Sequence, residues 1–223
     1  DQKGPYKPWF AALGALSYWF VGQFGAKAPR LLSRDKIETE EPAINTKSVA
    51  GGIEYRDGIL IDNDARFVFS FVRSAIEAGA AAANYVELVS AERHGDRWVA
   101  RLRDVDTNEE FQTSARTIVN AAGPFVDETN RSWGLTTNHR IVYSKGIHLV
   151  VPRLTTRYHS KVLAFYDDTE RLFYVIPMGR RSVIGTTDTR VDTPFTEVDE
   201  DDIEFLLSQI NARMDLDAPL TKD

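Results

Sequence analysis

Near the middle of the chain, an apolar run closes on the small residues Ala121, Ala122 and Gly123. None of these three residues has a side chain larger than a methyl group, so a flat or phosphate-bearing cofactor could approach the backbone. Pro124 stands where the first turn of a helix would begin, and that helix would offer N–H groups to an anion. An ordinary tight turn between strand and helix explains the same residues. On this pattern alone both interpretations stand.

Histidine is the side chain whose ordinary pKa makes it a general base near neutral pH. His148 lies on an expected strand between apolar neighbours, where a hydrogen-bonded core histidine is the usual explanation. His94, His139 and His159 lie among polar residues, without the pairwise spacing of a metal site. The sequence also lacks a calcium loop, a P-loop and a Gly-x-Ser-x-Gly elbow.

The apolar patterns predict a piece of parallel α/β sheet in the middle of the chain. A helix capped by Asp62 and Asn63 and stopped at Gly79 carries one apolar face and lies between two strands. A meander of short alternating strands follows, and the continuous apolar run 117–121 suits a strand covered on both faces. The expected strands are 48–55, 59–61, 80–86, 89–93, 98–103, 109–114, 117–121, 139–143, 147–151, 162–166, 172–176 and 182–186.

The segment 6–25 raises the question of a membrane helix. It is long enough to span a bilayer, but Lys7, Pro8 and several glycines dilute its apolar character. We expect instead an amphipathic helix that covers a core, with Trp9 and Phe20 on its apolar face. A helix lying in the membrane interface is a third interpretation. Other helices are expected at 33–39, 124–133 and 199–212.

Composition excludes several classes of protein. The 223 residues are 43% hydrophobic and 27% charged, as in a soluble globular protein with one large core or two modest ones. The formal net charge of -6 argues against nucleic acid as the main partner, because phosphate backbones select basic surfaces. The absence of cysteine excludes disulfides, thiolate metal sites and a cysteine-linked flavin.

Several separated motifs in one order narrow the family. The segments 145–152 (KGIHLVVP) and 184–188 (IGTTD) resemble the KG-x-H strand and the IGTTD strand end of the FAD-dependent glycerol-3-phosphate dehydrogenases. The helix, the meander and 116–125 (RTIVNAAGPF) resemble the cofactor domain of the wider amine-oxidase and DAO flavoprotein superfamily. Phe125 departs from the tryptophan usual after that turn but remains aromatic. The resemblance covers essentially the whole chain.

The resemblance implies a mixed α+β or α/β fold. It combines a partial, Rossmann-like FAD-binding sheet and its meander with a mainly antiparallel β substrate domain and flanking helices. Residues 1–47 would be the N-terminal helical part of the substrate or cap region, 48–134 the partial FAD-binding domain and 135–223 the substrate-binding domain.

The resemblance also assigns roles to residues of the site. His148 would face the substrate as the catalytic base, and the Thr187 hydroxyl would donate to a substrate oxygen. Lys145 would neutralise phosphate, although a solvated lysine at a strand end explains it equally well. The implied contacts of FAD are Val86, Asn120, Ala121, Ala122, Gly123 and Phe125.

The implied reaction is the oxidation of sn-glycerol 3-phosphate to dihydroxyacetone phosphate, with electrons passed to quinone. Such an enzyme sits peripherally on the inner face of the cytoplasmic membrane, and the first helix is one candidate contact surface. A homodimer is a further expectation, since strand edges without partners favour association.

Other parts of the family pattern are missing from these residues. No G-x-G-x-x-G loop, late Gly-rich segment or phosphate-holding arginines of the family occur here. We therefore expect an internal fragment that binds FAD weakly or not at all and has no turnover alone. Two alternatives remain: an amino-acid or amine oxidase of the same superfamily, and a non-catalytic domain that has lost its cofactor.

Overall fold

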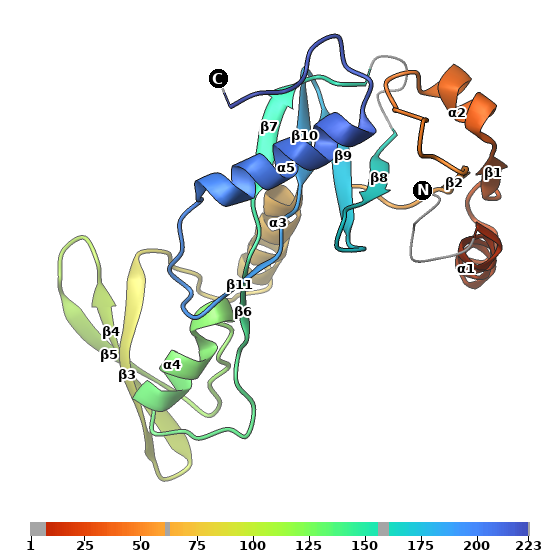
Figure 1. Cartoon of the computed structure of the whole chain (residues 1–223). Coiled ribbons are helices and arrows are strands. Elements are labelled where there is room, and N and C mark those ends of the chain that lie inside the picture. Colours follow the sequence, from red (N-terminus) through yellow and green to blue (C-terminus); the bar gives the residue numbers. More distant parts are fainter. Residues whose placement is uncertain (1–7, 61–62, 156–160, 223) are drawn as a thin grey trace. The chain divides into compact units, whose positions relative to one another are not determined.

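The structure is a computed structural model that describes residues 8–60, 63–155 and 161–222. Contacts within the chain divide it into two units (Figure 1). The first unit comprises Asp1–Gly58, Ser144–Val191 and Phe195–Asp223, and the second comprises Ile59–Tyr143 and Asp192–Pro194. The domain boundaries predicted after residues 47 and 134 do not coincide with these divisions and stay predictions.

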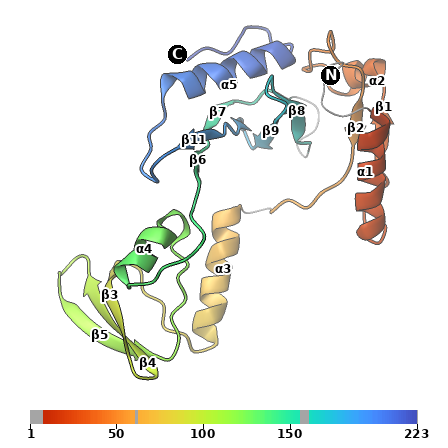
Figure 2. The same ribbon diagram turned by 60° about the horizontal axis from the view of Figure 1, so that its bottom comes forward.

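The first unit is built on a four-stranded antiparallel sheet with one helix across one of its faces (Figures 1 and 2). The strand order is β7-β10-β9-β8. Alternation along β9 and β10 directs Phe173, Val175 and Ile184 toward Ile210 and Met214 of the helix segment, and these five residues are at most 3% exposed. The elements are β7 His148–Pro152, β8 Leu163–Tyr166, β9 Leu172–Met178, β10 Arg181–Gly185 and α5 Glu200–Arg213.

The observed strands of this sheet and the helix α5 agree closely with those predicted from the sequence. The four strands predicted between 147 and 186 are confirmed to within two residues at each end. The predicted helix 199–212 is confirmed as α5, whose N-cap Asp199 accepts a hydrogen bond from the backbone N of Asp202. Three acidic residues in its first turn suit the positive end of the helix dipole.

The remaining elements of the first unit are short. The predicted helix after Ser33 is confirmed as α2, and the Ser33 side chain accepts from the backbone N of Lys36. A strand that the sequence did not predict, β1, pairs antiparallel with β2. The expected strand 48–55 is reduced to the three residues of β2. The elements are α1 Pro8–Val21, β1 Arg30–Leu32, α2 Arg34–Glu40, β2 Gly52–Glu54, β6 Tyr143–Lys145 and β11 Thr189–Val191, of which β6 and β11 pair.

The second unit contains the predicted meander, in the order β3-β4-β5. Its first helix is confirmed as α3, which begins after the N-cap Asn63 and ends before Gly79 in a left-handed conformation with φ of 93°. The rings of Trp98 and Trp133 lie 6.3 Å apart and join the end of α4 to the meander. The elements are α3 Asp64–Glu77, β3 Val86–His94, β4 Arg97–Asp104, β5 Glu110–Ala115, the 3-10 turn η1 Gly123–Phe125 and α4 Val126–Ser132.

The parallel strands predicted for this unit are wrong for the described residues. Segments 80–85 and 117–121 are irregular, as are 59–60 and 139–142. A strand's backbone groups need partners on a neighbouring strand, and no described strand pairs with these segments, although the backbone N of Val105 donates to the carbonyl oxygen of Tyr85. The mixed α/β class is confirmed, with antiparallel pairing in the three sheets whose register is defined.

Two helices leave their apolar side chains uncovered. Trp9 and Phe20 of α1 are 65% and 67% exposed, so the expectation that this helix covers a core is wrong here. On α3, Phe71 is 63% exposed. Within the described part of the chain, no helix has both the length and the apolar character needed to cross a membrane. The expectations for Lys7, Ile61, Asp62 and His159 concern positions outside the described residues.

Candidate active site

The two motifs at 144–148 and 184–188 meet at one end of the four-stranded sheet. The backbone N of Ile147 donates to Oγ1 of Thr187 over 3.0 Å. A Cβ on Gly146 would lie 2.5 Å from the Thr186 hydroxyl oxygen and 2.9 Å from the carbonyl oxygen of Thr187, so only glycine fits. Segments about 40 residues apart in sequence thus form one compact structure.

His148 is placed at the edge of this structure with its ring over a glycine. It is the first residue of β7 and lies opposite Gly185 of β10. A Cβ on Gly185 would come within 2.7 Å of the imidazole Cδ2 and 2.8 Å of the carbonyl oxygen of Ile147. The side chain of His148 is exposed, so the alternative of a core histidine is wrong.

One face of the sheet remains open, and His148 lies on it. Leu149 and Val151 pack against the core under α5, whereas Val150 on the opposite face is 63% exposed. In the register of the sheet, Gly185 pairs with His148 on one side and with Tyr174 on the other. Two strand spacings place the Cα atoms of His148 and Tyr174 roughly 10 Å apart.

Tyr174 and the nearby Tyr55 belong to no motif that predicted a site residue from the sequence. The alternation along β9 puts Tyr174 on the open face, but only the pairing of β9 with β10 brings it into the row of His148. Burial, the charge of Asp57 and the proximity of Tyr174 raise the pKa of Tyr55 above its usual value.

Thr187 is buried at the junction of the two motifs, with 5% of its surface exposed. Its oxygen accepts the hydrogen bond from Ile147, which leaves the hydroxyl proton to be donated elsewhere. The neighbouring Thr186 hydroxyl donates to the carbonyl oxygen of Thr187 over 2.9 Å and so supports the turn.

Lys145 is buried, at 8% exposed, and the alternative of a solvated lysine is wrong. Its ammonium pairs with the carboxylates of Asp199 and Asp202, the second at 2.6 Å, and donates to the carbonyl oxygen of Glu197. Hydrogen bonding of its ammonium to the carboxylates of Asp199 and Asp202 raises the pKa of Lys145, and Lys145 lowers the pKa of Asp199. The ammonium thus fixes the start of α5 through two carboxylates and one carbonyl oxygen, so the predicted phosphate contact would require Lys145 to leave both carboxylates.

The small-residue turn lies in the second unit and is held by Asn120. Its amide nitrogen donates to the carbonyl oxygen of Val126 over 3.0 Å and to Oδ1 of Asn130 over 2.8 Å. Its amide oxygen accepts from the backbone N of Ala122. Asn120 therefore shapes the turn. Gly123 has a φ of 56° and open space where a Cβ would stand.

The other predicted cofactor contacts are also in this unit. Val86 begins β3 and is half-buried, and Ala121 is exposed. Phe125 is 37% exposed, and its backbone N donates to the carbonyl oxygen of Ala122. Across the described ranges of both units, no three histidine or acidic side chains are grouped as metal ligands would be.

Comparison with known proteins decides the family. The model of the FAD dependent oxidoreductase family matches residues 7–222. The chain belongs to this family. Within the family, glycerol-3-phosphate dehydrogenase of Mycobacterium leprae is 31% identical over 221 residues, which cover 96% of this chain and 36% of the relative. The mitochondrial glycerol-3-phosphate dehydrogenase of Macaca fascicularis is 29% identical over 88% of this chain and 28% of the relative.

Solved structures of the family share the fold. Glycerol-3-phosphate dehydrogenase from Bacillus halodurans, complexed with FAD, matches 82% of this chain and 37% of its own, with a TM-score of 0.69 and 26% identity. Glycine oxidase from Bacillus cereus has a TM-score of 0.62 over 92% of this chain and 53% of its own, and at 19% identity it shows the fold alone. The chain spans about a third of the length of the curated relatives it matches.

FAD is the cofactor of the family, and the second unit fits part of it. The open space over Gly123 and the exposed backbone at Ala121 leave room for a large ligand to lie against the end of 117–121. Val119 in that segment is 82% exposed, which also suits a surface that another layer or a cofactor covers.

Proposed function

We propose that this chain is the central part of an FAD-dependent glycerol-3-phosphate dehydrogenase. The observation that carries the proposal is the close packing of 145–148 against 184–188, with His148 against Gly185 on an open sheet face and Thr187 hydrogen-bonded to the backbone of Ile147. The relatives from Mycobacterium leprae and Macaca fascicularis, both named glycerol-3-phosphate dehydrogenase, support the choice of substrate.

In the proposed reaction, the secondary alcohol of sn-glycerol 3-phosphate becomes the ketone of dihydroxyacetone phosphate. His148 accepts the hydroxyl proton, since an exposed imidazole can act as a base near neutral pH. The hydroxyl of Thr187 accepts from the backbone N of Ile147 and donates its proton to a substrate oxygen. The absence of a side chain at Gly185 leaves the space that the imidazole occupies, because a Cβ there would come within 2.7 Å of its Cδ2.

FAD, when bound, supplies the acceptor of the hydride from the same carbon. The residues proposed to hold it are Val86, Asn120, Ala121, Ala122, Gly123 and Phe125, with Asn120 acting by shaping the turn. Passage of the electrons to quinone, and contact with the inner face of the cytoplasmic membrane through the exposed aromatic side chains of α1, belong to the same proposal.

The decisive experiment measures dye-linked oxidation of sn-glycerol 3-phosphate by the whole protein that carries this sequence. Glycine and D-amino acids serve as control substrates. We expect His148→Asn to lower kcat by roughly a hundredfold to ten-thousandfold, as for loss of a general base. His94→Asn, at an exposed histidine in the β3–β4 turn, is the matched control and leaves kcat unchanged.

The alternatives make different predictions in the same assay. Activity with amines but not with sn-glycerol 3-phosphate would establish an amino-acid or amine oxidase instead. No flavin and no activity in the whole protein would establish a non-catalytic domain. The 223 residues alone are expected to be colourless after purification and without turnover, and a stoichiometric bound-flavin spectrum would contradict that.

A further inference from the structure

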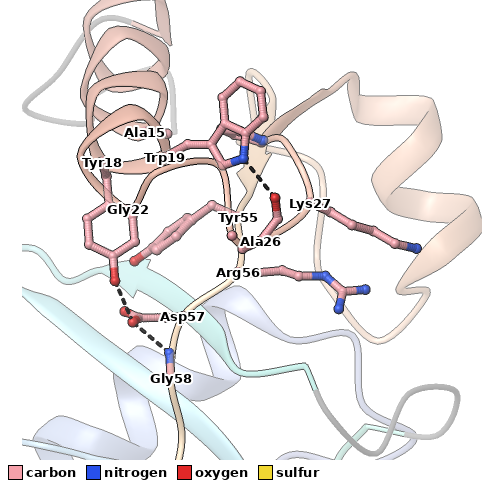
Figure 3. A pocket seen from close by; sticks show the side chains of 12 residues that line it. Ala15, Tyr18, Trp19, Gly22, Ala26, Lys27, Tyr55, Arg56, Asp57 and Gly58 are labelled. Atoms are coloured by element: carbon pink, nitrogen blue, oxygen red, sulfur yellow. Dashed lines mark hydrogen bonds between the residues drawn. The ribbon is translucent and has the colours of Figure 1, made fainter.

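A cavity of about 320 Å³ lies in the first unit, between α1 and the segment after β2 (Figure 3). Its volume is at the lower end of the range of small-molecule sites, roughly 300–1,000 Å³. Tyr18, Trp19 and Tyr55 form aromatic walls, and small residues such as Gly22 and Ala26 leave the space between them. The predicted roles of His148, Thr187 and the turn at 120–125 do not use this cavity.

The walls are held in place by contacts of their own. Tyr18 donates its hydroxyl proton to the carboxylate of Asp57 over 2.8 Å, and the rings of Tyr18 and Tyr55 meet edge to face. The Trp19 indole N–H donates to the carbonyl oxygen of Ala26 over 2.7 Å. The Tyr18 hydroxyl and the backbone N of Gly58 both donate to Oδ1 of Asp57.

The polar groups left over are donors and cations. Lys27 and Arg56 line the cavity and extend toward the same side in Figure 3, and neither has an ion-pair partner among the residues that the structure describes. The Tyr55 hydroxyl likewise has no hydrogen-bond partner within that part of the chain, and a phenol can donate its proton. In a chain of net charge -6, the lining of this cavity therefore carries two cations, Lys27 and Arg56, against the single carboxylate of Asp57.

We propose that this cavity binds a small organic anion with a flat apolar body, whose charge lies against Lys27 and Arg56. The aromatic walls bury the flat body, because stacked and edge-on ring contacts add to burial of apolar area. The guanidinium of Arg56 supplies a planar pair of donors to a phosphate or carboxylate group. The cavity shares Tyr55 with the open face of the sheet, but its cations Lys27 and Arg56 have no role in the proposed dehydrogenase chemistry.

Phenyl phosphate is a probe of this chemistry, and Trp19 is its reporter. We expect phenyl phosphate to change the tryptophan fluorescence of the chain saturably, with a Kd in the millimolar range or below. Phenol, without charge, and inorganic phosphate, without a ring, are each expected to bind at least about tenfold more weakly. Added salt weakens binding, since the cations are near solvent.

Variants assign the response to the cavity. Lys27→Gln with Arg56→Gln is expected to raise the Kd about tenfold, whereas Lys47→Gln with Arg190→Gln, at exposed cations outside the lining, leaves it unchanged. Trp19→Phe removes the fluorescence response while calorimetry still detects binding, and Trp9→Phe keeps both. Circular dichroism melting confirms that each variant is folded. No saturable binding of phenyl phosphate, or binding that the Lys27 and Arg56 variant retains, would overturn the proposal.

Discussion

The sheet under α5 and the helix α3 carry similarly apolar residues, but only the sheet buries them. Phe173 on β9 is 1% exposed, whereas Phe71 on α3 is 63% exposed. The sheet has a helix across one face, and the apolar stripe of α3 has no covering layer among the described residues. An amphipathic pattern therefore predicts a helix or a strand, whereas burial of its apolar face depends on which other element packs against it.

The largest expected effect tests that difference directly. Phe173→Ala should lower the free energy of unfolding by about 4 kcal/mol, because it leaves a cavity in a closed core. Phe71→Ala should lower it by less than about 0.5 kcal/mol, because little area is buried. Urea denaturation followed by far-UV circular dichroism measures both. Equal losses in the two variants would show that α3 is packed in solution.

A second pair of variants compares the two glycines of the candidate sites. Gly185→Ala should destabilise the chain by about 2 kcal/mol, since its Cβ would meet the ring of His148 and the backbone of Ile147. Gly123→Ala should cost about 1 kcal/mol, the backbone strain of a left-handed residue without a clash. Thermal unfolding gives the order. A harmless Gly185→Ala would contradict the close contact between β10 and β7.

The dependence of stability on pH tests the role of Lys145. Lys145 lowers the pKa of Asp199, so this pair stabilises the fold fully above the unfolded pKa of about 4 and loses that contribution as the pH falls through the folded value. Lys145→Gln should therefore be less stable than the parent chain at pH 7, with a gap that narrows on acidification below about pH 4. Urea midpoints measured from pH 3 to pH 7 check this. Lys47→Gln, at an exposed lysine, should show no gap at any pH.

The smallest effect is expected in the segment 117–121. Val119→Ser should change the free energy of unfolding by less than about 0.5 kcal/mol, because Val119 is 82% exposed. Amide hydrogen exchange measured by mass spectrometry should show that this segment is unprotected, whereas β9 and β10 are protected. A larger loss of stability, or slow exchange, would mean that the segment is packed as the sequence predicted.

Local patterns determined much of the fold. The caps Ser33, Asn63 and Asp199 and the stop at Gly79 act through the residues next to them, so the sequence suffices to place these helix ends. The same holds for the meander, whose tight turns join strands adjacent in sequence. The resemblance of 145–152 and 184–188 to motifs of a known family singled out His148 and Thr187, and the family match supports that choice of motifs.

Only the tertiary structure determined which residues from distant segments of the chain come into contact. Register alone brings Tyr174 into the row of His148, and close backbone approach alone explains Gly146 and Gly185. Lys145 looked like a solvated lysine or a phosphate contact, yet it is buried against Asp199 and Asp202, more than 50 residues away in sequence. Contacts between distant segments depend on how elements pack, and no local periodicity encodes that packing.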